Sequence, residues 1–179
     1  MTTLKSSATV EHVMKSRSDR SLSLKSTLGR TIHLVDLENL MGSCVMSAAD
    51  VAVVRHRFEV VAGACPADHV VIATGPAAAP DAWFGWGAAR RLLRSGLDGA
   101  DVALLEVIEL EHLHRRFRRV VVASGDGIFA HACAVLQSQG CEVTVVTRPE
   151  ALSVRLRLAV QDVRYLYLAA AESLVERVV

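Results

Sequence analysis

Three aspartates stand at the ends of apolar runs and could together hold a cation. Asp36 directly follows the run "TIHLV", Asp126 follows "VVVASG", and Asp101 closes "GLDGAD", where Asp98 competes for the same role. Clustered carboxylates repel one another unless a proton or a cation lies between them. Oxygen ligands without accompanying His or Cys favour Mg²⁺ or Mn²⁺. We therefore predict Asp36, Asp101 and Asp126 as metal ligands and catalytic residues.

The chemistry that such a site favours is phosphodiester hydrolysis. A bound divalent ion can hold a phosphodiester, polarise it and lower the pKa of an attacking water. Asn39 lies three residues after Asp36 and supplies an amide that can orient a phosphate or a metal-bound water, so it is a further predicted catalytic residue. Ser124 lies two residues before Asp126 and is predicted to contact the substrate or an adjacent carboxylate. Each acid alone would more often be a helix cap or turn residue, and only their combination indicates a site.

Arginines near the same strand ends could neutralise the phosphates that flank a scissile bond. Arg94 and Arg148 end apolar runs, and Arg155 and Arg157 follow shortly after the second of them. We predict Arg94, Arg148 and Arg155 as substrate-binding residues. The alternative is that they form ion pairs with Glu150, Asp162 or Asp98.

Two other conspicuous clusters have simpler interpretations. The run "RRFRR" at 115–119 precedes a strand, so it should lie at the opposite edge of the sheet and be a solvated connection or an oligomer contact. The aromatics Trp83, Phe84 and Trp86 could stack on bases, but core packing or a dimer contact is the more common role of such residues.

The elements that must position these residues alternate between strand and helix. Apolar runs predict strands at 31–35, 69–73, 89–94, 119–123 and 142–147, with an edge strand at 163–168. Helical spacing and caps predict helices at 47–62, 80–87, 98–114 and 128–139, and a helix or irregular segment after Pro149. This alternation is typical of an α/β fold with a mostly parallel sheet of about five strands, covered by helices on both faces. In such a sheet the carboxyl ends of the strands share one edge, which would bring the three acids together.

Composition separates a tail from one folded domain. Residues 1–30 hold six basic and two acidic residues and few large apolar groups, so we predict a disordered basic tail followed by a domain at 31–179. The four cysteines show no zinc-site spacing and are expected to be buried free thiols. With no membrane-spanning run and no signal peptide, we expect a cytoplasmic protein with no membrane partner.

Three segments resemble the NYN domains, a branch of the PIN-like nuclease superfamily. They are "VDLENL" at 35–40, "GLDGADVALLEVI" at 96–108 and "VVVASGDGIFAHACAVLQSQGCEVTVV" at 120–146, and the resemblance covers about residues 31–168. It implies a PIN-like, Rossmann-type three-layer sandwich and a Mg²⁺- or Mn²⁺-dependent endoribonuclease that acts on RNA. By this match Asp36, Asn39, Asp101 and Asp126 correspond to the acidic and amide residues of the family.

The sequence also departs from that family pattern. Family members often read Ser-Gly-Asp-x-Asp-Phe, but Ile128 stands in the place of the second aspartate. Glu106 is five residues from Asp101, about 140° around a helix, so both side chains cannot point at one ion. One metal is therefore favoured over two. A catalytically weak or inactive RNA-binding or scaffold domain is the alternative, and a homodimer is left open.

Overall fold

The protein is an α/β fold with a six-stranded, all-parallel sheet of order β3-β2-β1-β4-β5-β6. The structure, a computed structural model, describes residues 29–168. The strands are β1 Thr31–Asp36, β2 His69–Thr74, β3 Arg90–Leu93, β4 Arg119–Ala123, β5 Glu142–Thr147 and β6 Asp162–Tyr165. The predicted basic tail and any surface beyond residue 168 lie outside these residues.

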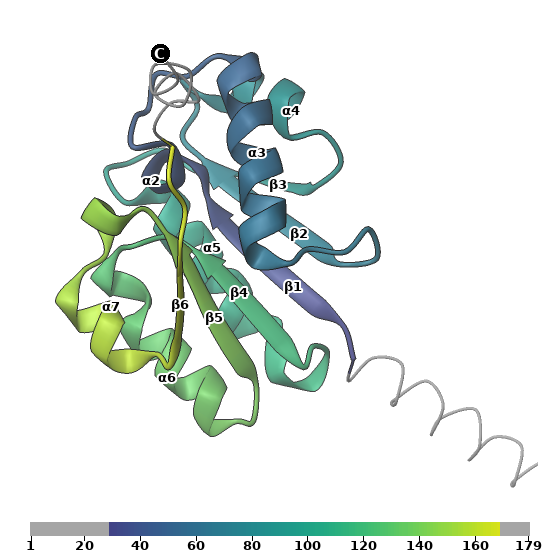
Figure 1. Ribbon diagram of the computed structural model, residues 1–179, viewed down its shortest axis with the longest axis vertical. Helices are drawn as coiled ribbons and strands as arrows, with labels where there is room; N and C mark the ends of the chain where they lie inside the picture. The colour runs from purple at the N-terminus through teal and green to yellow at the C-terminus, as the bar shows by residue number, and fades with distance from the viewer. Residues whose placement is uncertain (1–28, 169–179) are drawn as a thin grey trace, which may run out of the picture.

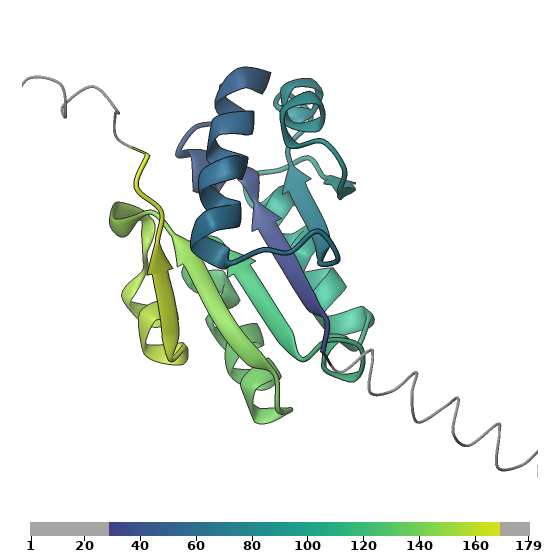
Figure 2. The ribbon, with the colours of Figure 1, turned by 45° about the vertical axis from the view of Figure 1, so that its right-hand side comes forward.

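The helices cover both faces of the sheet. They are α2 Leu37–Met41, α3 Ala48–Ala62, α4 Ala79–Trp86, α5 Gly99–Leu110, α6 Ala130–Ser138 and α7 Val154–Ala159, with 3₁₀ turns η1 Leu113–Arg115, η2 Gly127–Phe129 and η3 Pro149–Ala151. Helices α3 and α4 lie on one face, and α5, α6 and α7 lie on the other (Figures 1 and 2). The predicted α/β class and double coverage are confirmed, with six parallel strands in place of about five.

Two apolar cores result from the alternation of side chains along the buried strands. In β1, Leu34 joins the core beneath α5 and α6, whereas the next residue, Val35, joins the core beneath α3 and α4. Strands β1 and β4 lie side by side in the middle of the sheet and are almost completely buried. Because both strands are buried on both faces, they fix the position of whatever follows them at the carboxyl edge.

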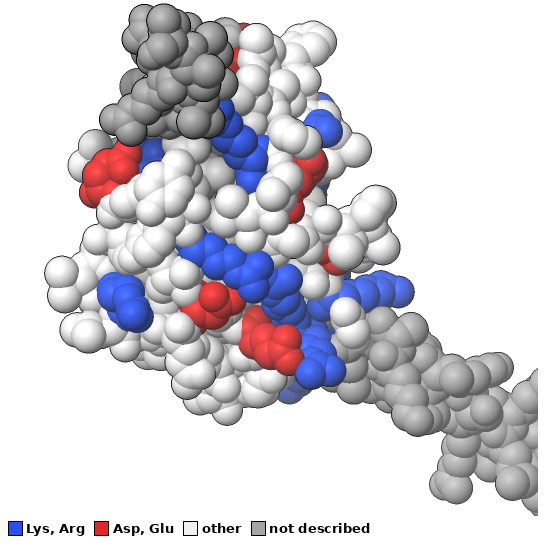
Figure 3. Space-filling model, in the orientation of Figure 1, with Lys and Arg blue, Asp and Glu red and all other residues white. Residues whose placement is uncertain are grey.

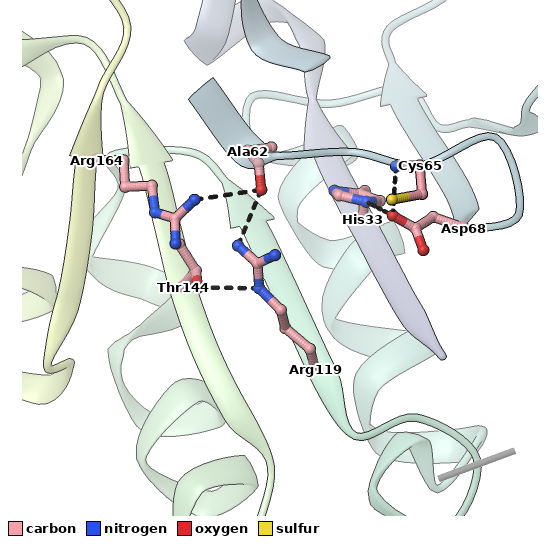
Figure 4. Close-up of polar contacts among 7 residues, drawn as sticks. All are labelled: His33, Ala62, Cys65, Asp68, Arg119, Thr144 and Arg164. Atoms are coloured by element: carbon pink, nitrogen blue, oxygen red, sulfur yellow. Dashed lines mark hydrogen bonds and ion pairs between the residues drawn. The ribbon is translucent and has the colours of Figure 1, made fainter. Parts of the chain in front are cut away.

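Helix α3 is held at both ends by polar contacts. Ser47 caps its start, accepting from the backbone N–H of Asp50. At its last turn, Arg119 donates to the carbonyl of Ala62 at 2.9 Å, and Arg164 donates to the carbonyls of Val61 and Ala62 at 3.1 and 3.3 Å (Figure 4). These guanidinium groups satisfy helix carbonyls that have no partner within the helix.

This arginine cluster lies where no described helix covers the sheet. Basic side chains form a band across that face of the molecule, with acidic side chains beside them (Figure 3). A groove of about 570 Å³ there is lined by residues including Arg119, Thr144, Asp162 and Arg164. Because Asp162 pairs with Arg164 at 3.2 Å and accepts from Thr144 at 2.9 Å, the cluster is internally satisfied.

The cysteine prediction was right for only two residues. All four thiols are free; Cys133 and Cys141 are buried, but Cys44 and Cys65 are exposed. The exposed pair lies in the loops on either side of α3, where short apolar neighbours in sequence do not imply burial. Among residues 29–168 no helix is long and apolar enough to cross a membrane.

Candidate functional site

Asp36 ends the central strand and is almost fully buried. It is 4% exposed and caps the short helix α2, its Oδ1 accepting from the backbone N–H of Asn39 at 3.2 Å. The side chain of Asp36 therefore stabilises the turn between β1 and α2. An isolated carboxylate in such a place is unstable without hydrogen bonds or a counter-charge.

Two side chains tie this strand end to the neighbouring one. The hydroxyl of Ser124 donates to Oδ2 of Asp36 at 3.0 Å and accepts from the N–H of Asp126 at 3.2 Å. The amide oxygen of Asn39 accepts from the N–H of Gly125 at 2.9 Å. Ser124 is completely buried. It is therefore placed to position the acids, while its predicted role in substrate contact remains a prediction.

Asp126 is exposed at the rim of this cluster. It caps the turn η2, its Oδ1 accepting from the N–H of Ile128 at 2.9 Å. One carboxylate oxygen is thus used by the backbone, and the side chain faces solvent.

Asp101 reaches the cluster from the first turn of α5. It is 9% exposed, and its Oδ1 is one of two buried side-chain N or O atoms among residues 29–168 that have no hydrogen-bond partner. It is close enough to Asp36 that each carboxyl group shifts the pKa of the other. Asp98, at the N-cap position of the same helix, is exposed and makes no side-chain cap. The structure thus places Asp101, and not Asp98, beside Asp36.

The electrostatics of the pair follow from burial and mutual repulsion. Burial, the negative charge of Asp36 and a hydrogen bond to it together raise the pKa of Asp101 to about 8, and Asp126 and Asp98 add to the rise. Burial also raises the pKa of Asp36, while hydrogen bonds from Asn39, Asp101 and Ser124 oppose that rise. These effects all oppose a second negative charge beside Asp36, so a single proton on the pair is favoured at neutral pH.

A divalent cation could replace that shared proton. The donor set consists of hard oxygens, and the unpartnered Oδ1 of Asp101 is a free acceptor at the buried position. However, no three His, Cys, Asp or Glu side chains within residues 29–168 are arranged to hold one ion. Asp36 and Asp101 therefore fit a cation as a pair, and Asp126 is the nearby acid that is not in place as a third ligand.

A close backbone crossing explains the glycine before Asp126. A Cβ on Gly125 would lie 2.2 Å from the carbonyl oxygen of Ala151, whose segment packs directly on this turn. Ser153 strengthens the contact by donating its N–H to the Gly125 carbonyl at 2.8 Å. The same segment carries Arg155, whose Cβ lies 3.5 Å from the position of a Cβ on Gly127.

The predicted substrate-binding arginines differ in their surroundings. Arg155 is exposed beside the turn of Asp126, and it makes no ion pair with any residue in 29–168. Arg148 donates to the carbonyl of Asn39 at 3.2 Å and pairs with Glu150.

Arg94 is turned away from the acids. It pairs with Glu106 at 2.5 Å on the outer side of α5, so neither of these residues joins the cluster. Of the three arginines, Arg155 is the one placed to meet a ligand at the rim, and the roles of the other two remain predictions.

Glu38 lies beside the acidic cluster, although it was not among the site residues predicted from the sequence. Its Oε1 accepts from the hydroxyl of Thr74 at 3.1 Å and from the N–H of Gly75 at 2.8 Å, linking α2 to the end of β2. Its charge adds to the rise in the pKa of Asp36. The only available signal was its position two residues after Asp36.

The other two sequence clusters have separate roles. Trp86 is buried in the core, and Phe84 is 84% exposed. The guanidinium carbon of Arg91 lies over the ring of Trp83, 5.5 Å from the ring centroid. In the basic run, Arg116 pairs with Glu111 at 2.8 Å, and Arg118 pairs with Glu142 at 2.8 Å. The solvated interpretation agrees with the ion pairs of Arg116 and Arg118, but not with Phe117, which is buried, or with Arg119, which donates to the carbonyl of Ala62.

Comparison with known proteins supports the fold and leaves the activity open. No protein-family model matches the chain. No curated protein matches it either. Among solved structures it is similar to VPA0982, a protein of unknown function from Vibrio parahaemolyticus RIMD 2210633, with a TM-score of 0.56 and 19% sequence identity over 79% of this chain and 94% of that one. At this identity the likeness shows a shared parallel α/β fold.

Proposed function

We propose that the protein is a metal-dependent endoribonuclease of the NYN type. The observation that carries the proposal is the buried Asp36–Asp101 pair at the carboxyl edge of the sheet, in which one oxygen of Asp101 has no hydrogen-bond partner. Structural ion pairs normally satisfy buried charges, whereas this pair brings two acids together and leaves one oxygen without a partner. RNA as the substrate rests on the resemblance of the three sequence segments.

Each residue of the cluster has a role in this proposal. Asp36 and Asp101 would hold Mg²⁺ or Mn²⁺, which when bound supplies charge for a phosphodiester and lowers the pKa of an attacking water. Asn39 and Ser124 fix the turn that carries Asp126, and Asp126 is placed to bind or orient water at the rim. Arg155 would hold a neighbouring phosphate of the RNA.

The test is cleavage of labelled single-stranded and structured RNA with and without Mn²⁺. We expect metal-dependent cleavage, and loss of about 10²-fold or more in Asp101→Asn. Asp98→Asn is the matched control, because Asp98 is exposed in the same helix start, and its rate should stay within about twofold. Absence of cleavage by the wild type, or equal loss in both variants, would refute the proposal.

A second candidate is an RNA-binding or scaffold domain without catalysis. Two observations favour it: Ile128, in place of the family's second aspartate, packs against the core, and no third carboxylate is in place for a cation within residues 29–168. In this case RNA binding would need no metal and would be unchanged in Asp101→Asn.

A further inference from the structure

Helix α3 is apolar on two sides. The side that faces the sheet contributes Val51, Val54 and Phe58 to the core, where all three are buried. On the outer side Val53 is 53% exposed and Val60 is 70% exposed. A surface helix normally presents a polar face to water, and a helix that is apolar all round is normally covered all round. The outer side of α3 is therefore a candidate docking surface.

The chain that follows β6 runs along this helix from its end toward its start. In the last turn of α3, the carbonyls of Val61 and Ala62 accept from Arg164 at 3.1 and 3.3 Å. Three residues later, and about one turn closer to the start of the helix, the carbonyl of Tyr167 accepts from Arg57 at 2.9 Å. In Figures 1 and 2 this stretch, in yellow, rises toward the end at which α3 begins. The residues after 168 therefore follow a path that leads to the first half of α3.

The segment at 169–179 has the sequence pattern of a helix with one apolar face. It lies outside the described residues and reads "AAAESLVERVV". Leu174, Val175 and Val178 recur with Ala171 at helical spacing. The polar residues fall on the opposite side of such a helix: Glu172, Ser173, Glu176 and Arg177. An isolated helix of this length is marginal in water, so the pattern favours a segment that packs against another apolar surface.

The reach of this segment matches the first half of α3. A helix rises about 1.5 Å per residue, so the segment spans about 16 Å as a helix, and the stretch from Arg57 back to Ala48 spans about 14 Å. Val53 lies within this stretch, whereas Val60 lies beyond Arg57 in the other direction. Because the segment is tethered beside this surface, its effective concentration there is on the order of millimolar, which favours it over a second copy of the chain.

We propose that residues 169–179 bind as an amphipathic helix to the outer side of α3, over Val53. Ala171, Leu174, Val175 and Val178 face α3, and the charged residues of the segment face water. The contact is independent of the proposed nuclease function, because the outer side of α3 contributes no residue to the acidic cluster.

Hydrogen exchange of the full chain, followed by mass spectrometry, tests this proposal. Amides of residues 172–179 in the wild type should exchange at least about tenfold more slowly than in an unstructured peptide of the same sequence. Val53→Asp places a charge beneath the segment and should speed this exchange by about fivefold or more. Val60→Asp is the matched control, because it introduces the same residue on the same side of α3 but out of reach, and it should change the exchange by less than about twofold.

Substitutions within the segment keep the test decisive if Val53→Asp disturbs α3. Leu174→Asp should speed the exchange as much as Val53→Asp does, whereas Ser173→Asp, on the polar side, should leave it within about twofold of the wild type. Wild-type exchange at the rate of the unstructured peptide would overturn the proposal, and so would equal effects of Val53→Asp and Val60→Asp. Protection that increases with protein concentration would place the segment on a second copy of the chain and would also overturn it.

Discussion

Two polar clusters lie at opposite ends of this sheet, one half-buried and one buried, and they differ in how their charges are satisfied. At the last turn of α3, Arg119 and Arg164 both donate to the carbonyl of Ala62 (Figure 4). Arg164 also donates to the carbonyl of Val61 and pairs with Asp162. At the carboxyl edge, Asp36 and Asp101 face each other, and one Asp101 oxygen has no partner.

The difference separates a structural cluster from a candidate site. Charges that find complementary groups within the fold stabilise it and leave little for a ligand to gain. The two acids that β1 and α5 place together lower the stability of the fold by repulsion. A cation or substrate that binds between them would stabilise it again.

Replacing the guanidinium of the structural cluster should affect stability alone. We expect Arg119→Met, which keeps the aliphatic part of the side chain, to lower the free energy of unfolding by about 2 kcal/mol, because the Ala62 carbonyl and Thr144 each lose a charged donor. RNA cleavage should stay within about twofold of the wild type. Denaturant unfolding measures the first quantity.

The control for that variant is Arg118→Met, in the same basic run. Its pair with Glu142 is exposed on both sides, so the cost should not exceed about 0.5 kcal/mol. Equal destabilisation by the two substitutions would show that Arg119 has no special structural role.

The acidic pair should make the metal-free protein less stable at higher pH. The pKa of Asp101 is raised from 3.8 to about 8, so between these values the folded protein keeps a proton that the unfolded chain has released. Unfolding free energy therefore falls as pH rises from 5 to 8. Thermal or denaturant unfolding in the presence of EDTA measures this slope, and Asp101→Asn should flatten it.

Added Mn²⁺ sharpens the same measurement. Because the cation competes with the proton shared by the pair, it should raise the melting temperature more at pH 8 than at pH 5.5. An equal shift at both pH values, or the same shift in Asp101→Asn, would place Mn²⁺ binding somewhere other than at this pair.

The smallest effect is expected at His33, a third buried polar group. Its Nε2 lies 3.0 Å from Asp68, its Nδ1 has no partner, and burial lowers its pKa below 6.5 (Figure 4). The unfolded chain thus takes up a proton first as pH falls, so stability should drop between pH 7 and 5. His33→Gln retains a donor for Asp68 without titrating, and an unchanged acid slope in this variant would contradict the prediction.

Much of the fold could be predicted because strand and helix patterns here are strong. The apolar runs gave β4 and β5 at the observed residues, and the Ser47 cap located the start of α3. Helix α2 was not predicted, because a five-residue helix is too short to show periodicity. The helix expected at 98–114 ends at Leu110, and His112 then takes a left-handed conformation with φ of 49°.

The candidate site was predictable as a set of acids and not as an arrangement. Strand ends in a parallel sheet must share an edge, so Asp36 and Asp126 could be expected near each other. The choice between Asp98 and Asp101 depended on where α5 begins and on which of its sides faces the sheet. Similarly, the pairing of Arg94 with Glu106 depended on packing across α5 that spacing does not reveal.

The sequence by itself determined the parallel α/β class and the acids at the ends of the central strands, because both follow from local periodicity and chain direction. Only the tertiary structure decided which carboxylates are buried together, which arginines are already paired, and which strand edge is left open. Those outcomes depend on distances between residues far apart in the chain, and hence on how the helices pack against the sheet.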